Sequence, residues 1–201
     1  AEAMREENEQ EWKHVIMGEV GDPATMVFPL LRPVRVGDID TSEFGNGPEC
    51  WRWLVGMDYG YRPDPTVCVV VGYNKVKKVL FITDEVRGVG WSEDGIYEHV
   101  KEVLNRHGRE IGKRLGLDIN TSSLINSEID NRIIDGLRAK GLNIYPVKKM
   151  SGSRDISYQF LTGGYGDLKE LWVDSEQCPT TWAEMVGAEF PRRDINGKEI
   201  I

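Results

Sequence analysis

Three stretches typical of β-strands follow one another between residues 51 and 86, and only short turns separate them. Residues 51–58 read WRWLVGMD, residues 66–73 read TVCVVVGY and residues 77–86 read KKVLFITDEV. β-Branched and aromatic residues favour strands, and connections this short join neighbours that run antiparallel. The pattern predicts a three-stranded meander whose middle strand, almost purely apolar, is buried on both faces.

Strand and helix patterns alternate after this meander. Ser92 is the expected N-cap of the first helix, and Ser151 or Ser153 of the third. The alternation predicts an α/β fold in which a mixed sheet, with three antiparallel strands and then parallel ones, carries helices on both faces. Helices are expected at 91–112, 129–141, 151–164 and 179–188, and strands at 122–128, 142–149 and 168–175.

The residues before the meander are expected to form a connector. Residues 2–18 contain good helix formers and predict a helix. The stretch MVFPLLRPVRV at 26–36 contains two prolines, which suits an edge strand or a docked irregular segment. Residues 37–49 predict a polar linker rich in turns. We therefore expect a connector helix and arm over residues 1–49 and one compact domain over residues 50–201.

Charge and hydropathy exclude several classes of protein. Of 201 residues 33 are acidic and 25 basic, and the formal charge of −8 argues against a protein that coats nucleic acid through general positive charge. It still allows an enzyme that meets nucleic acid through metal ions. No unbroken apolar run is long enough for a transmembrane helix, and the charged N-terminal residues do not read as a secretory signal, so no membrane partner is expected.

Cysteine and histidine contribute little to the candidate chemistry. The three cysteines lie far apart without a CxxC pair, which argues against a disulfide framework and a structural zinc site. Cys68 lies in the apolar run VCVVVG and is expected to be a packed core thiol. The three histidines form no HxxxH or HExxH pattern. If the protein is an enzyme, carboxylates are therefore the leading candidates for its chemistry.

The first candidate is Asp58, which ends the first strand between Gly56 and Gly60. A carboxylate at the end of a central strand is costly unless it is paired or bound to a metal. Asp64 follows six residues later, and if the turn folds back, a divalent cation would relieve the repulsion between the two carboxylates. The alternative is that both aspartates only form turns, which Asp-Pro sequences commonly do.

The adjacent carboxylates Asp84 and Glu85 are expected to end the third strand. Neighbouring residues of a strand face opposite sides of a sheet, so only one of the two can point into a site beside Asp58. We expect Asp84 to be solvated and Glu85 to cap a helix or bind.

Two further carboxylates follow the fourth strand. Glu128 ends it, at the edge where open α/β sheets place their sites, although a partly exposed glutamate is the plain alternative. Asp130 begins the next helix, where it is expected to act as an N-cap. Lys148, Lys149 and Arg154 surround Ser151-Gly152-Ser153 in a basic loop before a helix. Such a loop suits a phosphate, although a solvated loop with a serine cap explains it equally well.

Taken together, the sequence resembles the nuclease domain of the large terminase subunit of tailed bacteriophages. The similarity covers nearly the whole chain, and the order and spacing of the motifs is stronger than any one of them. The motifs are EWKHVIMGEVGDPATMVFP at 11–29, GMDYG at 56–60 with Asp64-Pro65-Thr66, VLFITDE at 79–85, IIDGLRAKG at 133–141, and PVKK at 146–149 with Ser151-Gly152-Ser153.

The chain departs from this family in two places. Where the family usually carries an asp-ser-ala-glu-like stretch, the chain reads Asn126-Ser127-Glu128-Ile129-Asp130, and we assign the metal role to Glu128 because glutamate can reach where aspartate does. The family's last metal aspartate lies in an asp-ala-x-arg-tyr-like helix, and the chain stops at Ile201 before such a motif. The ATPase domain is absent too, so we expect an excised domain.

The resemblance implies an RNase H-like fold and an endonuclease that cuts concatemeric viral DNA during packaging by two-metal hydrolysis. Asp58 and Glu128 would be catalytic, and Asp58 would bridge two Mg²⁺ or Mn²⁺ ions about 4 Å apart. The implied partners are double-stranded DNA, the terminase ATPase domain, the small terminase subunit and the portal, in the host cytoplasm. The further metal ligands would be Asp64, Glu128 and Asp130, and the DNA contacts Lys148, Lys149, Ser153 and Arg154.

Three competing interpretations remain. A recombinase, transposase or junction resolvase core would share the acidic strand ends and differ in its products. Actin-like sugar kinases and ATPases also carry a gly-x-asp-x-gly turn before a hairpin, although this chain is short for their two lobes. A non-catalytic docking module of a packaging motor would use the acidic strand ends only as turns, and it predicts no tight metal binding.

Overall fold

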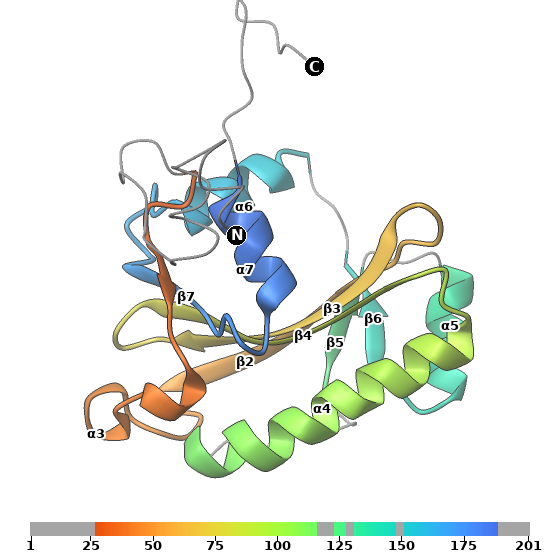
Figure 1. Ribbon diagram of the computed structural model, residues 1–201, viewed down its shortest axis with the longest axis horizontal. Coiled ribbons are helices and arrows are strands. Elements are labelled where there is room, and N and C mark those ends of the chain that lie inside the picture. The colour runs from red at the N-terminus through yellow and green to blue at the C-terminus, as the bar shows by residue number, and fades with distance from the viewer. Residues whose placement is uncertain (1–26, 116–122, 128–130, 148–150, 189–201) are drawn as a thin grey trace, which may run out of the picture.

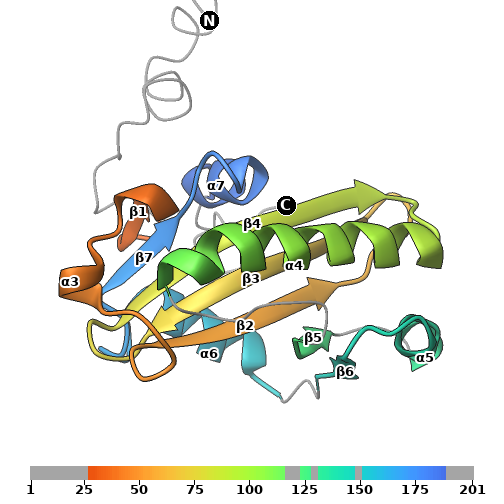
Figure 2. The same ribbon diagram turned by 90° about the horizontal axis from the view of Figure 1, so that it is seen from below.

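The computed structural model describes residues 27–115, 123–127, 131–147 and 151–188. Within these residues one sheet of seven strands runs in the order β1-β7-β4-β3-β2-β5-β6 (Figures 1 and 2). No helix in this part of the chain has both the length and the apolar character needed to cross a bilayer. The helix expected at residues 2–18 lies outside the described residues.

The predicted meander forms the centre of the sheet. It consists of β2 (Trp51–Asp58), β3 (Pro65–Asn74) and β4 (Val79–Val89), each antiparallel to the next. The strand β2 matches the predicted strand residue for residue. The expectation that the middle strand is buried on both faces is wrong, because residues of β3 alternate between buried and half-buried. One face of β3 lies in a fully packed core, and the opposite face is covered less completely.

Parallel strands extend the meander on both sides. On one side β5 (Ile125–Ser127) pairs with β2 and β6 (Ile144–Pro146) pairs with β5, whereas on the other side β7 (Glu170–Val173) pairs with β4. The predicted mixed sheet is confirmed. The helices that alternate with these strands are α4 (Glu93–Leu115), α5 (Asn131–Ala139), α6 (Ser153–Leu161) and α7 (Pro179–Val186).

Helices cover both faces of the sheet, as expected. In Figure 1, α4 lies below the sheet, α5 lies at the right beside α4 and β6, and α6 and α7 lie above the sheet. On the α4 face, Val55, Met57 and Ile125 pack with apolar residues of α4 and α5. On the opposite side, called the α7 face below, Leu171 and Val173 of β7 pack with apolar residues of α6 and α7.

Two expected helix caps have different outcomes. Ser92 caps α4, because its Oγ accepts a hydrogen bond of 3.2 Å from the backbone N–H of Gly95. The serine cap expected for α6 is wrong. The N-cap of α6 is Gly152, with φ of 77° and no side-chain hydrogen bond. A left-handed backbone at this position suits glycine.

The arm before the meander joins the sheet. Leu31–Pro33 forms the edge strand β1, parallel to β7, which confirms one of the two predicted forms of this segment. The following stretch is more than a polar linker. It contains the short helices η1 (Val36–Asp38) and α3 (Thr41–Phe44), and Ile39 between them is 3% exposed, packed with the aromatic residues of the sheet.

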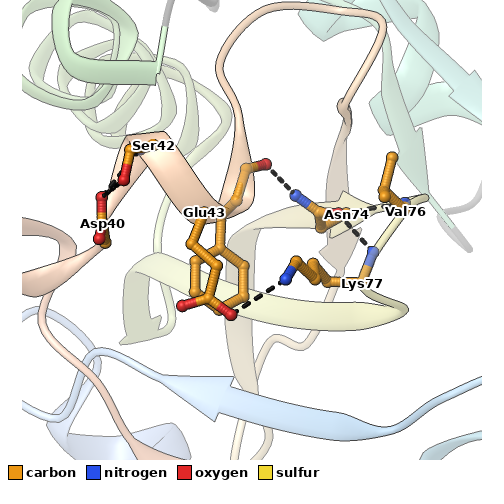
Figure 3. A network of polar contacts seen from close by, with 7 residues as sticks. Asp40, Ser42, Glu43, Asn74, Val76 and Lys77 are labelled. Carbon is orange, nitrogen blue, oxygen red and sulfur yellow. Dashed lines mark hydrogen bonds and ion pairs between the residues drawn. The ribbon is translucent and has the colours of Figure 1, made fainter.

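A polar network fastens α3 to the turn between β3 and β4 (Figure 3). Asn74 is fully buried and donates a hydrogen bond of 2.7 Å to the backbone oxygen of Phe44. Its own side-chain oxygen accepts hydrogen bonds from the backbone N–H groups of Val76 and Lys77. The Lys77 ammonium lies 3.0 Å from the Glu43 carboxylate. One buried amide therefore shapes the turn and holds the arm against it.

The reactivity of the three cysteines depends on how deeply each one is packed in the fold. The three thiols are free, with Cys68 and Cys178 buried and Cys50 half-buried. Burial raises the pKa of the Cys68 thiol to about 12, with a smaller contribution from Asp84, and burial raises the pKa of the Cys178 thiol as well. Since thiolates are the reactive form, we expect Cys50 alone to react promptly with a disulfide reagent at neutral pH. Titration with and without denaturant measures this, and rapid reaction of Cys68 in the folded chain would contradict the packing.

Candidate active site

Asp58 ends a strand at the centre of the sheet. Its side chain is exposed, and alternation along β2 places it on the α7 face, since Val55 and Met57 are buried against α4. Within the described part of the chain, the Asp58 carboxylate has no hydrogen-bond or ion-pair partner. An unpartnered carboxylate at this position is free to bind a cation.

The loop after Asp58 folds back on itself. A side chain at Gly60 would collide with the carbonyl oxygens of Asp64 and Pro65, so this position requires glycine. Thr66 Oγ1 donates a hydrogen bond of 2.7 Å to the carbonyl oxygen of Gly60 and holds the loop closed. The backbone of Asp64 therefore lies against Gly60, two residues beyond Asp58, and the Asp64 side chain is exposed. Whether Asp64 shares a cation with Asp58 stays a prediction.

The carboxyl end of β5 lies beside that of β2. The two strands run parallel, with Gly56 opposite Asn126 and Met57 opposite Ser127. Asp58 is the next residue of β2, and Glu128 is the next residue after Ser127 in the sequence. Glu128 and Asp130 lie outside the described residues, so their meeting with Asp58 stays a prediction.

The predicted basic loop is described only in part. Lys148 and Lys149 lie outside the described residues, and the side chain of Arg154 is not described either. Ser153 is half-buried and is the first residue of α6. Their proposed contact with DNA therefore rests on the sequence.

The pair Asp84 and Glu85 does not end β4, because the strand continues to Val89. The two side chains face opposite sides of the sheet, as expected. Asp84 is not solvated: it is 2% exposed, and its Oδ1 accepts hydrogen bonds from Nε of Arg106, at 3.0 Å, and from Nη2. The sequence interpretation failed here because the partner of Asp84 lies 22 residues away, on α4.

Glu85 caps a helix, one of the two roles expected of it. Its two carboxylate oxygens accept hydrogen bonds of 2.8 Å from the backbone N–H groups of Thr180 and Thr181 at the start of α7. The Thr181 hydroxyl donates a third, of 2.5 Å. A carboxylate at a helix N-terminus satisfies N–H groups that have no partner in the helix. Glu85 thus fixes α7 on the face that carries Asp58.

Among the described residues, Asp58 and the nearby Asp64 are the candidate ligands for a metal ion. Carboxylate oxygen is the ligand type that Mg²⁺ and Mn²⁺ prefer, and Asp58 offers it at an open strand end. Among the described residues no group of three or more histidine, cysteine, aspartate or glutamate side chains could hold a metal ion. Further ligands would have to come from residues such as Glu128 and Asp130.

The sheet order and the strand directions define an RNase H-like fold, with a carboxylate at the end of its first central strand. Comparison with solved structures supports this class. The nuclease domain of the large terminase of bacteriophage SPP1, solved with bound Mn, superposes with a TM-score of 0.62, at 24% identity, over 86% of each chain. The expected RNase H-like fold is therefore confirmed.

Two other solved structures share the fold. The large terminase nuclease domain of P22 has a TM-score of 0.51 at 11% identity, covering 83% of each chain. That of the thermophilic phage G20c, solved with bound magnesium, has a TM-score of 0.51 at 15% identity, covering 88% of this chain and 86% of its own. These likenesses concern the fold, since identity is low.

Sequence comparison agrees with the structural one. The large terminase subunit of Bacillus phage SPP1 is 24% identical over 204 residues, which span 100% of this chain and 42% of that protein. The chain therefore corresponds to less than half of the relative's length. No family model matches the chain. The resemblance to large terminase nuclease domains stated from the motifs is confirmed at the level of the fold.

Sequence reasoning assigned no functional role to two residues on the face of Asp58. Asn126 of β5 is half-buried, and Tyr145 of β6 is 50% exposed. The alternation of buried Ile125 and Ser127 around Asn126, and of buried Ile144 beside Tyr145, could have placed both on one face. The signal was weak because each strand has three residues.

Proposed function

We propose that the chain is the nuclease domain of a bacteriophage large terminase subunit and cuts concatemeric viral DNA during genome packaging. The single observation that supports this most is the exposed Asp58, which has no partner among the described residues. It lies at the carboxyl end of β2, next to the carboxyl end of β5, in a fold shared with nuclease domains solved with bound Mn and Mg. The proposed cofactor is accordingly Mg²⁺ or Mn²⁺.

We propose separate roles for two groups of residues, one that binds the metal ions and one that binds the DNA backbone. Asp58 would hold the cation between β2 and β5, with Glu128, Asp130 and Asp64 as the proposed further ligands. Two bound divalent ions would supply an activated water and charge neutralisation at the leaving oxygen. Lys148, Lys149, Ser153 and Arg154 are proposed to hold the phosphate backbone, which compensates locally for the formal charge of −8.

The proposed organisation and partners follow from the same resemblance. Residues 1–49 are proposed as the connector and arm, and residues 50–201 as the nuclease domain. The arm contributes the edge strand β1 to the sheet, and its helix α3 is held by Asn74. The proposed partners besides DNA are the ATPase domain, the small terminase subunit and the portal, in the host cytoplasm.

Cleavage of supercoiled plasmid tests the function directly. We expect linear and nicked products with Mn²⁺ or Mg²⁺, and none with Ca²⁺ or excess chelator. Isothermal titration with Mn²⁺ provides a second reading that does not depend on turnover. A folded chain that neither binds Mn²⁺ nor cuts plasmid would contradict the proposal and favour a docking module. Cleavage confined to branched DNA junctions would favour a resolvase.

A further inference from the structure

One row of side chains crosses the sheet beside Asp58. Gly56 of β2 is paired with Asn126 of β5, which is paired with Tyr145 of β6. Paired residues share a face, and this row lies on the α7 face because Val55, Ile125 and Ile144 point into the opposite core. From strand spacing and rise, the Cα of Asn126 lies about 8 Å from that of Asp58, and the Cα of Tyr145 about 12 Å.

The packing of the described residues does not require the glycine in this row. Among the described residues, a Cβ added at Gly56 would meet only Val69 Cγ2, at 3.7 Å, which is an ordinary contact. This differs from Gly60, where the backbone leaves no room for a side chain. The missing side chain therefore leaves open surface between Asp58 and Asn126, where a ligand backbone can approach closely.

The outer end of the row carries a braced aromatic ring. Tyr145 is 50% exposed, and the guanidinium carbon of Arg138 lies 4.4 Å from the centroid of its ring. Arg138 is fixed in turn, because its Nε donates a hydrogen bond of 2.7 Å to the carbonyl oxygen of Ile144 and its Nη1 lies 3.4 Å from the Asp135 carboxylate. A ring held this way loses little conformational entropy when a ligand binds. The positive charge of the neighbouring Arg138 guanidinium favours an anionic ligand.

We propose that Gly56, Asn126 and Tyr145 form a track that guides one strand of the DNA substrate to Asp58. Asn126 donates its amide N–H to a phosphate, and Tyr145, with Arg138, packs against a base or sugar farther along the same strand. Continuity with Asp58 and the combination of an amide, an aromatic ring and a guanidinium fit a nucleic-acid strand. This inference rests on the proposed nuclease function.

The test separates binding from chemistry. DNA affinity is measured by fluorescence anisotropy with a labelled duplex that has a short single-stranded end, in Ca²⁺, and steady-state cleavage of the same DNA is measured in Mn²⁺. Tyr145→Ala is expected to weaken binding and raise KM about tenfold, with kcat nearly unchanged. Tyr145→Phe keeps the ring and is expected to behave like the parent chain.

A matched control is available outside the track. Tyr165 is 55% exposed and follows α6, so Tyr165→Ala removes a similar ring and should leave both affinity and KM unchanged. Circular dichroism melting of each variant checks that the fold is retained. Equal weakening by both tyrosine variants would overturn the track.

Asn126 has its own discriminating pair of variants. Asn126→Ala is expected to weaken DNA binding severalfold, and Asn126→Asp to weaken it further, because a carboxylate repels phosphate. Asn126→Asp could instead tighten Mn²⁺ binding in titration calorimetry without weakening DNA binding. Asn126 would then lie at the metal site, and its proposed contact with a DNA phosphate would be overturned.

The failure of this inference differs from that of the nuclease function. A parent chain that binds and cuts DNA, with Tyr145→Ala unchanged in affinity and KM, refutes the track and leaves the nuclease intact. A folded parent chain that neither binds nor cuts DNA refutes both. Loss of binding to a protein partner by Tyr145→Ala, with DNA affinity unchanged, would assign the surface to that partner.

Discussion

Replacing Asp58 with alanine is expected to reduce metal-dependent DNA cleavage by about a thousandfold, since loss of a bound divalent ion removes several kcal/mol of transition-state stabilisation. The stability of the folded state should change little. The Asp58 side chain is exposed and has no hydrogen-bond or ion-pair partner among the described residues, so the free energy of unfolding should change by less than about 0.5 kcal/mol. Plasmid cleavage and urea unfolding measure the two effects on one preparation.

Two further aspartate variants serve as a control for Asp58→Ala and as a test of the neighbouring loop. Asp38 is also exposed, and it lies in η1 of the arm, so Asp38→Ala should cut like the parent chain. Asp64→Ala separates two interpretations of the loop after β2. A loss of Mn²⁺ affinity would support Asp64 as a ligand, and unchanged affinity would make it a turn residue. If Asp58→Ala cut plasmid normally, the site would have to be placed elsewhere.

The sequence predicted those parts of the fold that depend on interactions between residues close in sequence. The strand at 51–58 ends where its alternation ends, and Ser92 begins a helix because its hydroxyl reaches an N–H three residues on. The arm shows the limit of such reasoning. Its charged and turn-forming residues predict a linker, yet buried Ile39 and the amide of Asn74 bind it to the sheet. Contacts from distant parts of the sequence decide its position.

In the candidate site, too, some residues can be identified from local sequence and others only from contacts between distant parts of the chain. Asp58 could be selected from the sequence because a carboxylate between two glycines at a strand end is conspicuous by itself. For Asn126 and Tyr145 the sequence offers only a weak alternation over three-residue strands, and their relation to Asp58 exists only once β5 and β6 are placed in parallel beside β2. The fate of Asp84 also depends on tertiary structure. Pairing with β3 continues β4 beyond it, and Arg106 of α4 reaches it.

Arg106→Ala is expected to lower the free energy of unfolding by about 3 kcal/mol. The Asp84 side chain is 3% exposed and that of Arg106 is 35% exposed, so the pair lies largely within the core between β4 and α4. Removal of Arg106 takes the guanidinium away from a buried carboxylate, which costs far more than the pair itself contributes. Urea denaturation followed by circular dichroism measures the change.

Arg87→Ala is the matched control, because it removes the same type of side chain from the same strand as Asp84. Arg87 pairs with Glu184 of α7, and their side chains are 34% and 63% exposed. Solvent screens such a pair, and its loss should cost less than about 1 kcal/mol. A double variant, Arg106→Met with Asp84→Leu, removes both buried charges and should be more stable than Arg106→Ala. If Arg106→Ala cost no more than Arg87→Ala, water would have to reach Asp84, which would contradict the burial of its carboxylate.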